Sequence, residues 1–296
     1  MSVVMLGFSA AGLCQTPYWQ DVSTVEVNRE APRTEFVTYT SEEKALTRDF
    51  SSSENYQLLN GNWKFLYYDS YKDVPASVTD PATDDSSWNE IKVPGNWELQ
   101  GYGTAIYVNH PYEFSPVNPQ PPQLPEATPV GVYRRTFTVD GSWADKDIFL
   151  NIAGAKSGVY VYVNGREVGY SEDSKDVAQF RLNDYLKDGE NTLVLKIYRW
   201  STGSYLECQD FWRISGIERD VYLSAQARTS IRDFDVVSTL DDTYTDGLFS
   251  LKVMTTGSGA CEVAYKLVDA AGKTVLSGSK QAQGGDLSLI HISEPT

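Results

Sequence analysis

The chain is poor in the residues from which metal centres and hydrolytic triads are built. Of its 296 residues only two are histidine, His110 and His291, and three are cysteine, Cys14, Cys208 and Cys261. The cysteines lack metal-ligand spacing and are odd in number, which argues against a structural zinc site and against a disulfide framework. Two histidines are too few for a multi-histidine metal site and leave a Ser-His-Asp triad almost no candidate base.

Positive charge is also scarce. The chain holds 25 Lys and Arg against 40 Asp and Glu, which gives a formal net charge of -15. Nucleic acid is therefore not expected as a partner, because binding to phosphates requires clusters of Lys and Arg and the sequence has no compact basic patch.

Long apolar runs are missing too. Residues 1–14, MSVVMLGFSAAGLC, are apolar or small but too few to span a bilayer, and we expect no membrane span elsewhere. The Gly-Leu-Cys end of this segment has the small-x-small shape of a signal-peptidase site, although the usual basic residues are absent. We expect a truncated signal peptide, which predicts a periplasmic or secreted protein; the alternative is that the segment is not a signal.

What the chain has in plenty is alternation of apolar and polar residues with a period of two. Residues 158–171, GVYVYVNGREVGYS, alternate around an Asn-Gly pair (164–165) that tolerates the positive φ angles of a type I′ hairpin turn. Residues 191–198, NTLVLKIY, alternate in the same way. Helical periodicity is weak and confined to stretches near 41–48 and 183–187. The sequence therefore predicts an all-β chain.

Two segments interrupt the strands and suggest how the chain is organised. The proline-rich residues 116–130, PVNPQPPQLPEATPV, have strands on both sides, so we expect an ordered excursion in polyproline conformation. After Ala225 three alternating strands follow that resemble the start of an immunoglobulin-type sandwich. Such a sandwich needs roughly 100 residues and about 60 remain. We therefore expect an incomplete second domain.

The last ten residues, LSLIHISEPT, fit no continuation of these strands. They match, residue for residue, the translation of a common transposase sequencing adapter, so we expect the native sequence to end near Asp286 and His291 to be foreign to it. The predicted organisation is a signal peptide (1–14), an N-terminal arm (15–45), a jelly-roll domain (46–226), a partial immunoglobulin-like domain (227–286) and the adapter-derived segment (287–296).

Residues 203–223, GSYLECQDFWRISGIERDVYL, crowd aromatic rings, carboxylates and arginines around a short turn. Neither a solvated loop nor a plain core strand has this composition. Aromatic faces beside carboxylates suit a sugar, since they offer apolar surface for stacking and acceptors for hydroxyl groups. The run also closes one domain and leads into the next, and ligand clefts often lie at domain junctions.

An ordered series of segments carries a resemblance to a known family. The segments are LNGNWKF (59–65), VPGNWELQGYGTAIYVN (93–109), PVGVYRRTF (129–137), residues 162–200, and the run 203–223. Over roughly residues 17–286 the chain is similar to the N-terminal part of the large bacterial β-galactosidases of glycoside hydrolase family 2.

The resemblance implies a galactose-binding-like jelly roll, an immunoglobulin-like domain and then a (β/α)8 barrel that carries the chemistry. That chemistry is glycoside hydrolysis with retention, performed by two carboxylates about 5 Å apart on the barrel. We therefore expect no catalytic residue in this chain. Glu207 and Asp210 match no catalytic motif of the family, so we do not expect them to be such a pair.

Two residues of the family's galactosyl site do have counterparts here. The resemblance assigns Asn109 to galactosyl contact, and it assigns Asp210 to galactosyl hydroxyls and to a sodium ion. The magnesium ions of the full-length family would have their ligands outside this chain. The alternative for Asp210 is an ion pair with Arg213 beneath the Trp212 ring, and for Asn109 a turn-capping role before His110.

The remaining expectations concern partners and neighbours. We expect a galactoside as substrate and a homo-oligomer at full length, with the fragment inactive alone. The alternatives are a stand-alone carbohydrate-binding module, or a family member acting on β-glucuronides or β-mannosides. Trp212 and Tyr205 are interpreted as core residues, Arg213 and Arg219 as partners of nearby carboxylates, and residues 172–175 as a solvated loop.

Overall fold

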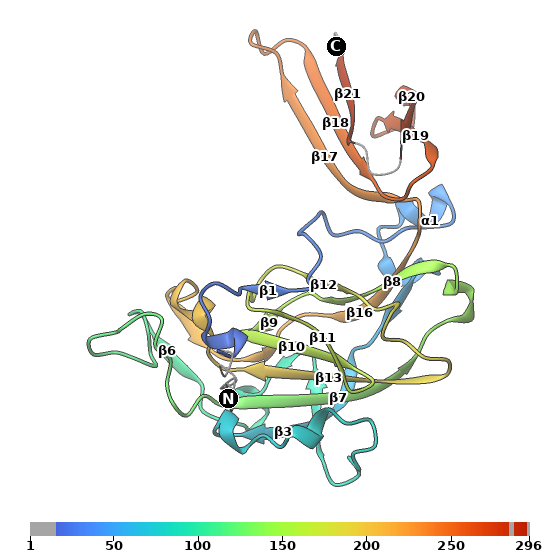
Figure 1. Cartoon of the computed structure of the whole chain (residues 1–296). Helices are drawn as coiled ribbons and strands as arrows, with labels where there is room; N and C mark the ends of the chain where they lie inside the picture. The colour runs from blue at the N-terminus through green and yellow to red at the C-terminus, as the bar shows by residue number, and fades with distance from the viewer. Residues whose placement is uncertain (1–15, 284–286, 295–296) are drawn as a thin grey trace, which may run out of the picture.

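The computed structural model describes residues 16–283 and 287–294, and the proposed signal peptide lies outside these ranges. Strands build two bodies, a large one up to β16 (Val221–Ala227) and a smaller one after it (Figure 1). Among the described residues α1 (Glu42–Leu46) is the only α-helix, and no helix there is long and apolar enough to cross a membrane. The prediction of an all-β chain is thus confirmed. The helical signal near 183–187 is wrong, because residues 183–185 form a turn and residues 186–187 are irregular.

The first sheet of the large body has seven strands, and every neighbouring pair is antiparallel. In spatial order they are β1 (Glu26–Val27), β11 (Arg166–Ser171), β10 (Gly158–Val163), β13 (Glu190–Tyr198), β7 (Val130–Thr138), β3 (Gly61–Tyr68) and β4 (Asn89–Val93). The second sheet consists of β12 (Ala178–Arg181), β8 (Lys146–Ile152), β16 and β2 (Tyr56–Leu58).

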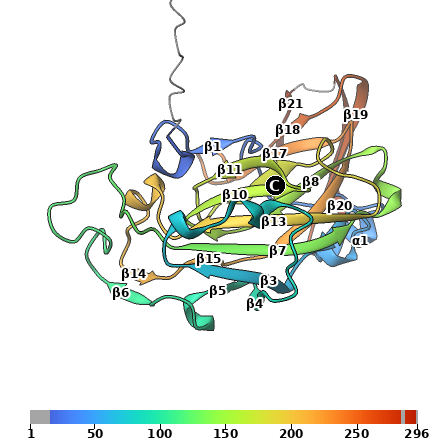
Figure 2. The same ribbon diagram turned by 60° about the horizontal axis from the view of Figure 1, so that its bottom comes forward.

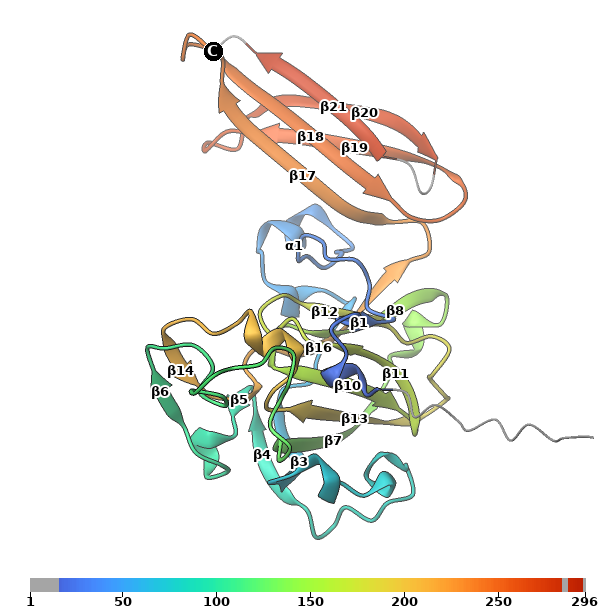
Figure 3. The ribbon, with the colours of Figure 1, turned by 60° about the vertical axis from the view of Figure 1, so that its left-hand side comes forward.

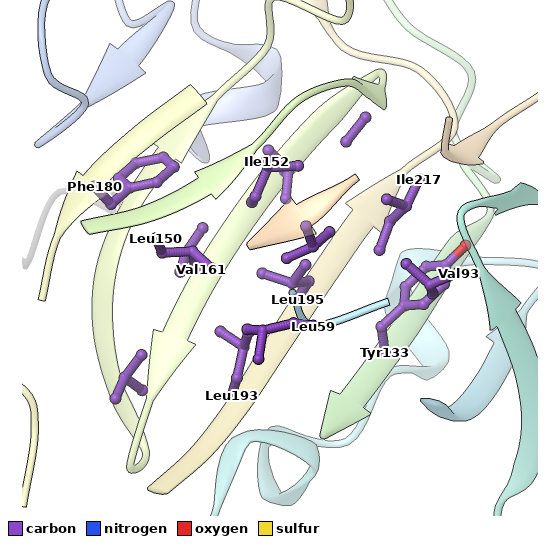
Figure 4. Packing of buried hydrophobic residues seen from close by; sticks show 14 of the residues in the cluster. Leu59, Val93, Tyr133, Leu150, Ile152, Val161, Phe180, Leu193, Leu195 and Ile217 are labelled. Carbon is purple, nitrogen blue, oxygen red and sulfur yellow. The ribbon is translucent and has the colours of Figure 1, made fainter. Parts of the chain in front are cut away.

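The hydrophobic core lies between these two sheets. Leu150, Ile152 and Phe180 from the second sheet meet Val161 and Leu195 from the first, and each of these side chains is at most 1% exposed (Figure 4). Apolar residues two apart in a strand point to the same face, so the period-two alternation of the sequence supplies this layer. The large body is the two-sheet sandwich expected of a jelly roll.

The hairpin between β10 and β11 confirms the turn expected from the sequence. Asn164 and Gly165 have φ angles of 53° and 79°, and Val163 pairs with Arg166 across them. Both central residues of a type I′ turn require positive φ, which Asn and Gly adopt at low cost.

Smaller elements complete the large body. A three-stranded sheet joins β5 (Gly95–Asn96), β15 (Gly216–Ile217) and β9 (Ala155–Lys156), and a two-stranded sheet joins β6 (Ile106–Val108) to β14 (Phe211–Arg213). The 3-10 helices are η1 (Tyr18–Gln20), η2 (Phe50–Ser52), η3 (Tyr71–Asp73), η4 (Ala76–Thr79), η5 (Glu98–Gln100), η6 (Gly141–Trp143) and η7 (Thr202–Tyr205).

The smaller body consists of two further sheets. Its strands are β17 (Ile231–Leu240), β18 (Gly247–Thr255), β19 (Ala260–Val268), β20 (Thr274–Gln283) and β21 (Leu287–Glu294), paired as β17-β18-β21 and β19-β20. Val253, Val263 and Ala282 form a small buried core there. β21 covers the segment attributed to an adapter, and its pairing with β18 does not test that attribution, which stays a prediction.

The N-terminal arm connects both bodies. Trp19 is 1% exposed and stacks on Tyr198 of the seven-stranded sheet, with 5.1 Å between ring centroids. Further along, the Thr34 amide donates to Asp233 Oδ1 at the start of β17, and Phe36 packs on Phe234. The arm therefore ties the sandwich to the first strand of the smaller body.

Candidate functional site

The ribbon formed by β6 and β14 lies next to the two predicted sugar-contacting residues. Trp212 pairs with Tyr107, and Phe211 pairs with Val108 at the end of the ladder. Asn109 and Asp210 are the next residues of the two segments, and both lie in bends just outside the strands. The ribbon lies at one edge of the sandwich (Figures 2 and 3).

The two faces of this ribbon differ in exposure. Tyr107 and Trp212 are directly opposite and share one face, and the hydrogen bond from Tyr107 brings Asp210 to the same side. These three residues are exposed, as is Asn109, with 55% of Tyr107 and 54% of Trp212 accessible to solvent. The other face contains Arg213, which is 3% exposed, together with three partly buried apolar residues: Ile106, Val108 and Phe211. We call the first face, with Tyr107, Asp210 and Trp212, the outer face of the ribbon.

Asp210 is oriented by a neighbour on the outer face. Tyr107 Oη donates a hydrogen bond to Asp210 Oδ1 at 2.9 Å, and this bond raises the pKa of the Tyr107 phenol because the adjacent carboxylate disfavours phenolate. The Tyr107 and Trp212 rings are also in contact, with centroids 5.6 Å apart and planes inclined by 56°. The carboxylate and the indole are thus held next to each other.

Two sequence-based interpretations of this region are wrong. Asp210 does not pair with Arg213, because the two side chains lie on opposite faces and Arg213 instead faces Glu113, with Arg213 Nε 3.3 Å from Glu113 Oε2. Trp212 is not a core residue, since half of it is exposed. A three-residue strand is too short for its alternation to show which face is buried.

Arg219 also differs from the prediction. Its guanidinium donates to the backbone carbonyls of Lys175, at 2.7 Å, and Ala153, at 3.4 Å. Tyr205 is half-buried, donates its hydroxyl to the Gln123 carbonyl, and packs on Phe114. Tyr205 therefore supports the loop that follows β6.

A buried ion pair anchors the ribbon from its inner face. The side chains of Glu113 and Arg213 are 6% and 2% exposed, and Trp200 Nε1 donates to Glu113 Oε1 at 3.1 Å. Arg213 Nη2 donates to the carbonyl of His110, the residue after Asn109. The pair therefore connects β14 to the segment that contains Asn109. No sequence signal identified Glu113, because it lies 100 positions from its partner in an irregular loop.

Glu207, the second carboxylate of the run 203–223 considered for catalysis, has a structural role. Its two carboxylate oxygens accept hydrogen bonds from the amide and the hydroxyl of Ser174, at 2.8 and 2.5 Å. Residues 172–175 are not the solvated loop expected, since Glu172 is 3% and Ser174 0% exposed. Burial raises the pKa of Glu172, whose carboxylate accepts from Thr202 and Gly203.

The described residues provide few ligands for a cation at Asp210. Within residues 16–283 and 287–294 no three His, Cys, Asp or Glu side chains converge as a metal site. Asp210 is exposed and supplies hard carboxylate oxygens, of which Oδ1 already accepts from Tyr107. It fits the role of one ligand in a partial site, and not that of a complete site.

The fold and the outer face together define an all-β sandwich that presents a surface suited to sugars. Residues 56–227 match the model of the sugar binding domain of glycosyl hydrolases family 2. The match covers more than half of the chain, so the chain belongs to glycoside hydrolase family 2.

Among the curated relatives of the chain are proteins named β-galactosidase. The chain is 40% identical over 238 residues to that of Priestia megaterium, which covers 79% of this chain and 23% of the relative. It is 38% identical over 260 residues to that of Vibrio cholerae, which covers 87% of this chain and 25% of the relative. The chain thus spans about a quarter of the length of these relatives.

Solved structures support the fold. Bacteroides uniformis β-glucuronidase 2 has a TM-score of 0.61 at 20% identity over 81% of this chain and 27% of its own. Bifidobacterium dentium β-glucuronidase has a TM-score of 0.62 at 16% identity over 82% of this chain and 42% of its own. At these identities the likeness concerns architecture only.

Proposed function

We propose that this chain is the N-terminal part of a retaining β-galactosidase that hydrolyses terminal β-D-galactosyl residues, and that Asn109 and Asp210 contact the galactosyl unit. The observation that supports the proposal is the β6–β14 ladder, which ends one residue short of both Asn109 and Asp210 although they are 101 positions apart in the chain. The 38–40% identity to β-galactosidases supports galactose over glucuronic acid or mannose as the sugar.

The chemistry of both side chains suits this role. A carboxylate accepts hydrogen bonds from sugar hydroxyls and binds hard cations, and an amide both donates and accepts. Asp210 would contribute one oxygen to a sodium ion, with the other ligands supplied from outside this chain. The ligands of the family's magnesium ions, and the acid and nucleophile, would likewise lie elsewhere. Residues 1–14 support a periplasmic or secreted location, and we propose a homo-oligomer at full length.

The chain alone is expected to hydrolyse o-nitrophenyl β-galactoside no faster than buffer. Retention requires two carboxylates about 5 Å apart around the glycosidic bond. Glu207 accepts two hydrogen bonds from Ser174 and Asp210 accepts one from Tyr107, so we do not assign these two carboxylates to such a pair. If the chain hydrolysed the substrate faster than buffer, and if Asp210→Asn or Glu207→Gln abolished that activity, the proposal that the acid and nucleophile lie outside this chain would be refuted.

Asp210→Asn is expected to remove most of the contact between the chain and a galactoside. We expect weak binding of methyl β-galactoside by the unaltered chain, with a Kd on the order of 10 to 100 mM, because few groups contact the sugar. Saturation-transfer NMR measures such affinities, and the substitution should weaken binding about tenfold by removing a charged acceptor. Asp242→Asn, an exposed aspartate in the smaller body, is the matched control.

Comparison with methyl β-glucuronide and methyl β-mannoside in the same assay tests the choice of sugar. Equal or stronger binding of either would favour that sugar and contradict the galactoside. A second candidate function is that of a stand-alone carbohydrate-binding module. The observation that favours it is that the outer face is exposed and therefore accessible to a sugar. Calorimetric titration with galactose and lactose that gives a Kd of about 1 mM or tighter would favour the module.

A further inference from the structure

A buried arginine lies at the base of the β6–β14 ribbon, where the ribbon joins the sandwich. Arg199 directly follows β13, the central strand of the seven-stranded sheet, and its side chain is 6% exposed. Its own amide donates to the carbonyl of Pro129, just before β7, at 2.9 Å. The backbone of Arg199 is thus fixed to the neighbouring strand of the sandwich, and only its side chain reaches the ribbon.

The guanidinium of Arg199 holds both strands of the ribbon through one nitrogen. Nη2 donates to the carbonyl of Thr104, two residues before β6, at 2.8 Å, and to the carbonyl of Arg213, the last residue of β14, at 3.3 Å. Arg213 pairs with Ile106 in the ladder, so the two carbonyls lie at the same end of the ribbon. One side chain of the sandwich therefore binds both strands at their base.

A buried carboxylate faces the same guanidinium. The side chain of Glu98 is 0% exposed, and its Oε1 lies 3.5 Å from Arg199 Nη1. Its Oε2 accepts from the amide of Ser215, two residues after β14, at 2.8 Å. We call Arg199 and Glu98 the base clamp, since together they bind the chain where it enters β6 and where it leaves β14.

The ribbon needs such support because it is small. β6 and β14 have three residues each, and within residues 16–283 and 287–294 they pair only with each other. An isolated two-stranded ribbon is at best marginally stable in water. Because Tyr107 of β6 donates to Asp210, which directly precedes β14, the closure of the ribbon also determines where this carboxylate lies.

We propose that Arg199 is a positioning residue of the galactosyl site. Through the base clamp it keeps the ribbon closed and fixed to the sandwich, and it thereby places Asp210 for the sugar. The inference rests on the proposed function, from which it takes the role of Asp210. Arg199 acts from the buried side of the ribbon and does not itself contact the sugar.

The geometry of the clamp requires arginine and not merely a positive charge. A guanidinium presents donors in several directions from one rigid plane, as two carbonyls and a carboxylate demand. Lysine is shorter and ends in a single ammonium group. Arg199→Lys therefore keeps a positive charge opposite Glu98 but loses the fork that bridges the two strands.

The test combines hydrogen–deuterium exchange of the 296-residue chain with its binding of methyl β-galactoside. In Arg199→Lys, peptides covering residues 104–110 and 209–215 should exchange about tenfold faster, because a hydrogen bond from a charged donor is lost at the base of the ribbon. Exchange of residues 190–198, in β13, should stay within about twofold, since the sandwich remains closed. Saturation transfer should show about threefold weaker galactoside binding, because only the closed ribbon holds Asp210 in place.

Arg134→Lys is the matched control. Arg134 is 3% exposed and donates to the backbone carbonyls of Asp80 and Pro81, each at 2.9 Å, so it also is a buried arginine that holds a loop by its main chain. That loop is not part of the ribbon. The control should therefore leave both the exchange of the ribbon and galactoside binding unchanged.

A second variant keeps the proposal testable if Arg199→Lys does not fold. Arg199→Met with Glu98→Gln removes both charges, so no unpaired charge is left buried. The amide oxygen of the glutamine can still accept from Ser215, but no donor remains for the two carbonyls. This double variant should show the same faster exchange of the ribbon and the same weaker binding.

The possible failures are distinguishable. Unchanged exchange of the ribbon in the Arg199 variants would overturn the clamp. Faster exchange with unchanged galactoside binding would overturn the positioning role and leave the proposed function standing. No binding of the galactoside by the unaltered chain would overturn the proposed contact by Asp210, and with it the positioning role, whereas the exchange data would still decide whether Arg199 holds the ribbon.

Discussion

Glu113→Gln is expected to lower the free energy of unfolding of the sandwich by about 3 to 5 kcal/mol. Glu113 and Arg213 are almost completely buried, and 3.3 Å separates Glu113 Oε2 from Arg213 Nε. Without the carboxylate, the guanidinium charge stays buried and has no opposite charge beside it, which costs far more than the loss of one hydrogen bond. Guanidinium chloride unfolding followed by tryptophan fluorescence measures the change.

The double variant Glu113→Gln with Arg213→Met removes both charges and should recover most of the lost stability, because no unpaired charge is then left buried. Glu54→Gln is the control for carboxylate removal, since Glu54 pairs with Lys44 at the surface and both side chains are more than 40% exposed. Its unfolding midpoint should hardly move. A loss below about 1 kcal/mol in Glu113→Gln would show that the pair does not anchor the ribbon.

Gly131→Ala is expected to destabilise the sandwich by about 3 kcal/mol. Gly131 lies in β7 between β13 and β3, and a Cβ placed on it would come within 2.4 Å of Trp97 Cζ3 and 3.0 Å of Phe65 Cε2. Trp97 and Phe65 are both 0% exposed, so neither ring has space to move. The same denaturant unfolding measures the effect.

A double-mutant cycle identifies the cause. Trp97→Ala alone should cost about 3 to 5 kcal/mol, but in that background Gly131→Ala should cost much less, because the added methyl group enters the vacated space. Gly141→Ala provides the control, since a Cβ there would meet no atom within 4 Å. If the two substitutions at 97 and 131 proved additive, the clash with the indole would not be the reason for glycine at 131.

The sequence correctly predicts those strands and turns in which the alternation of apolar and polar residues matches the alternation of buried and exposed side chains. The Asn-Gly turn at 164–165 and the alternation of 191–198 were identified correctly, because strands of six to nine residues with one buried face show a clear period of two. Asn109 and Asp210 follow from the family resemblance alone, because local pattern gives no reason to single them out.

The rest depended on tertiary contacts. β6 and β14 have three residues each, which is too few for alternation to reveal that Trp212 points outward. The sequence predicts Asp210 as a partner of Arg213 because it is three positions away along the chain. In the structure the partner is Glu113, which lies in a distant loop. Nearness in sequence is a poor guide to ion pairs in a sheet, where neighbouring residues alternate between faces.

The pairing of β6 with β14 also determines when the outer face can exist. β7, β8, β10, β11, β12 and β13 all lie between these two strands in the chain, so pairing β6 with β14 closes a loop of about 100 residues, which is a contact of high sequence separation. A growing polypeptide therefore contains β6 long before its partner strand has been synthesised. During that time Tyr107 and Val108 have no partner in β14, so the ribbon can form only after most of the sandwich strands have left the ribosome.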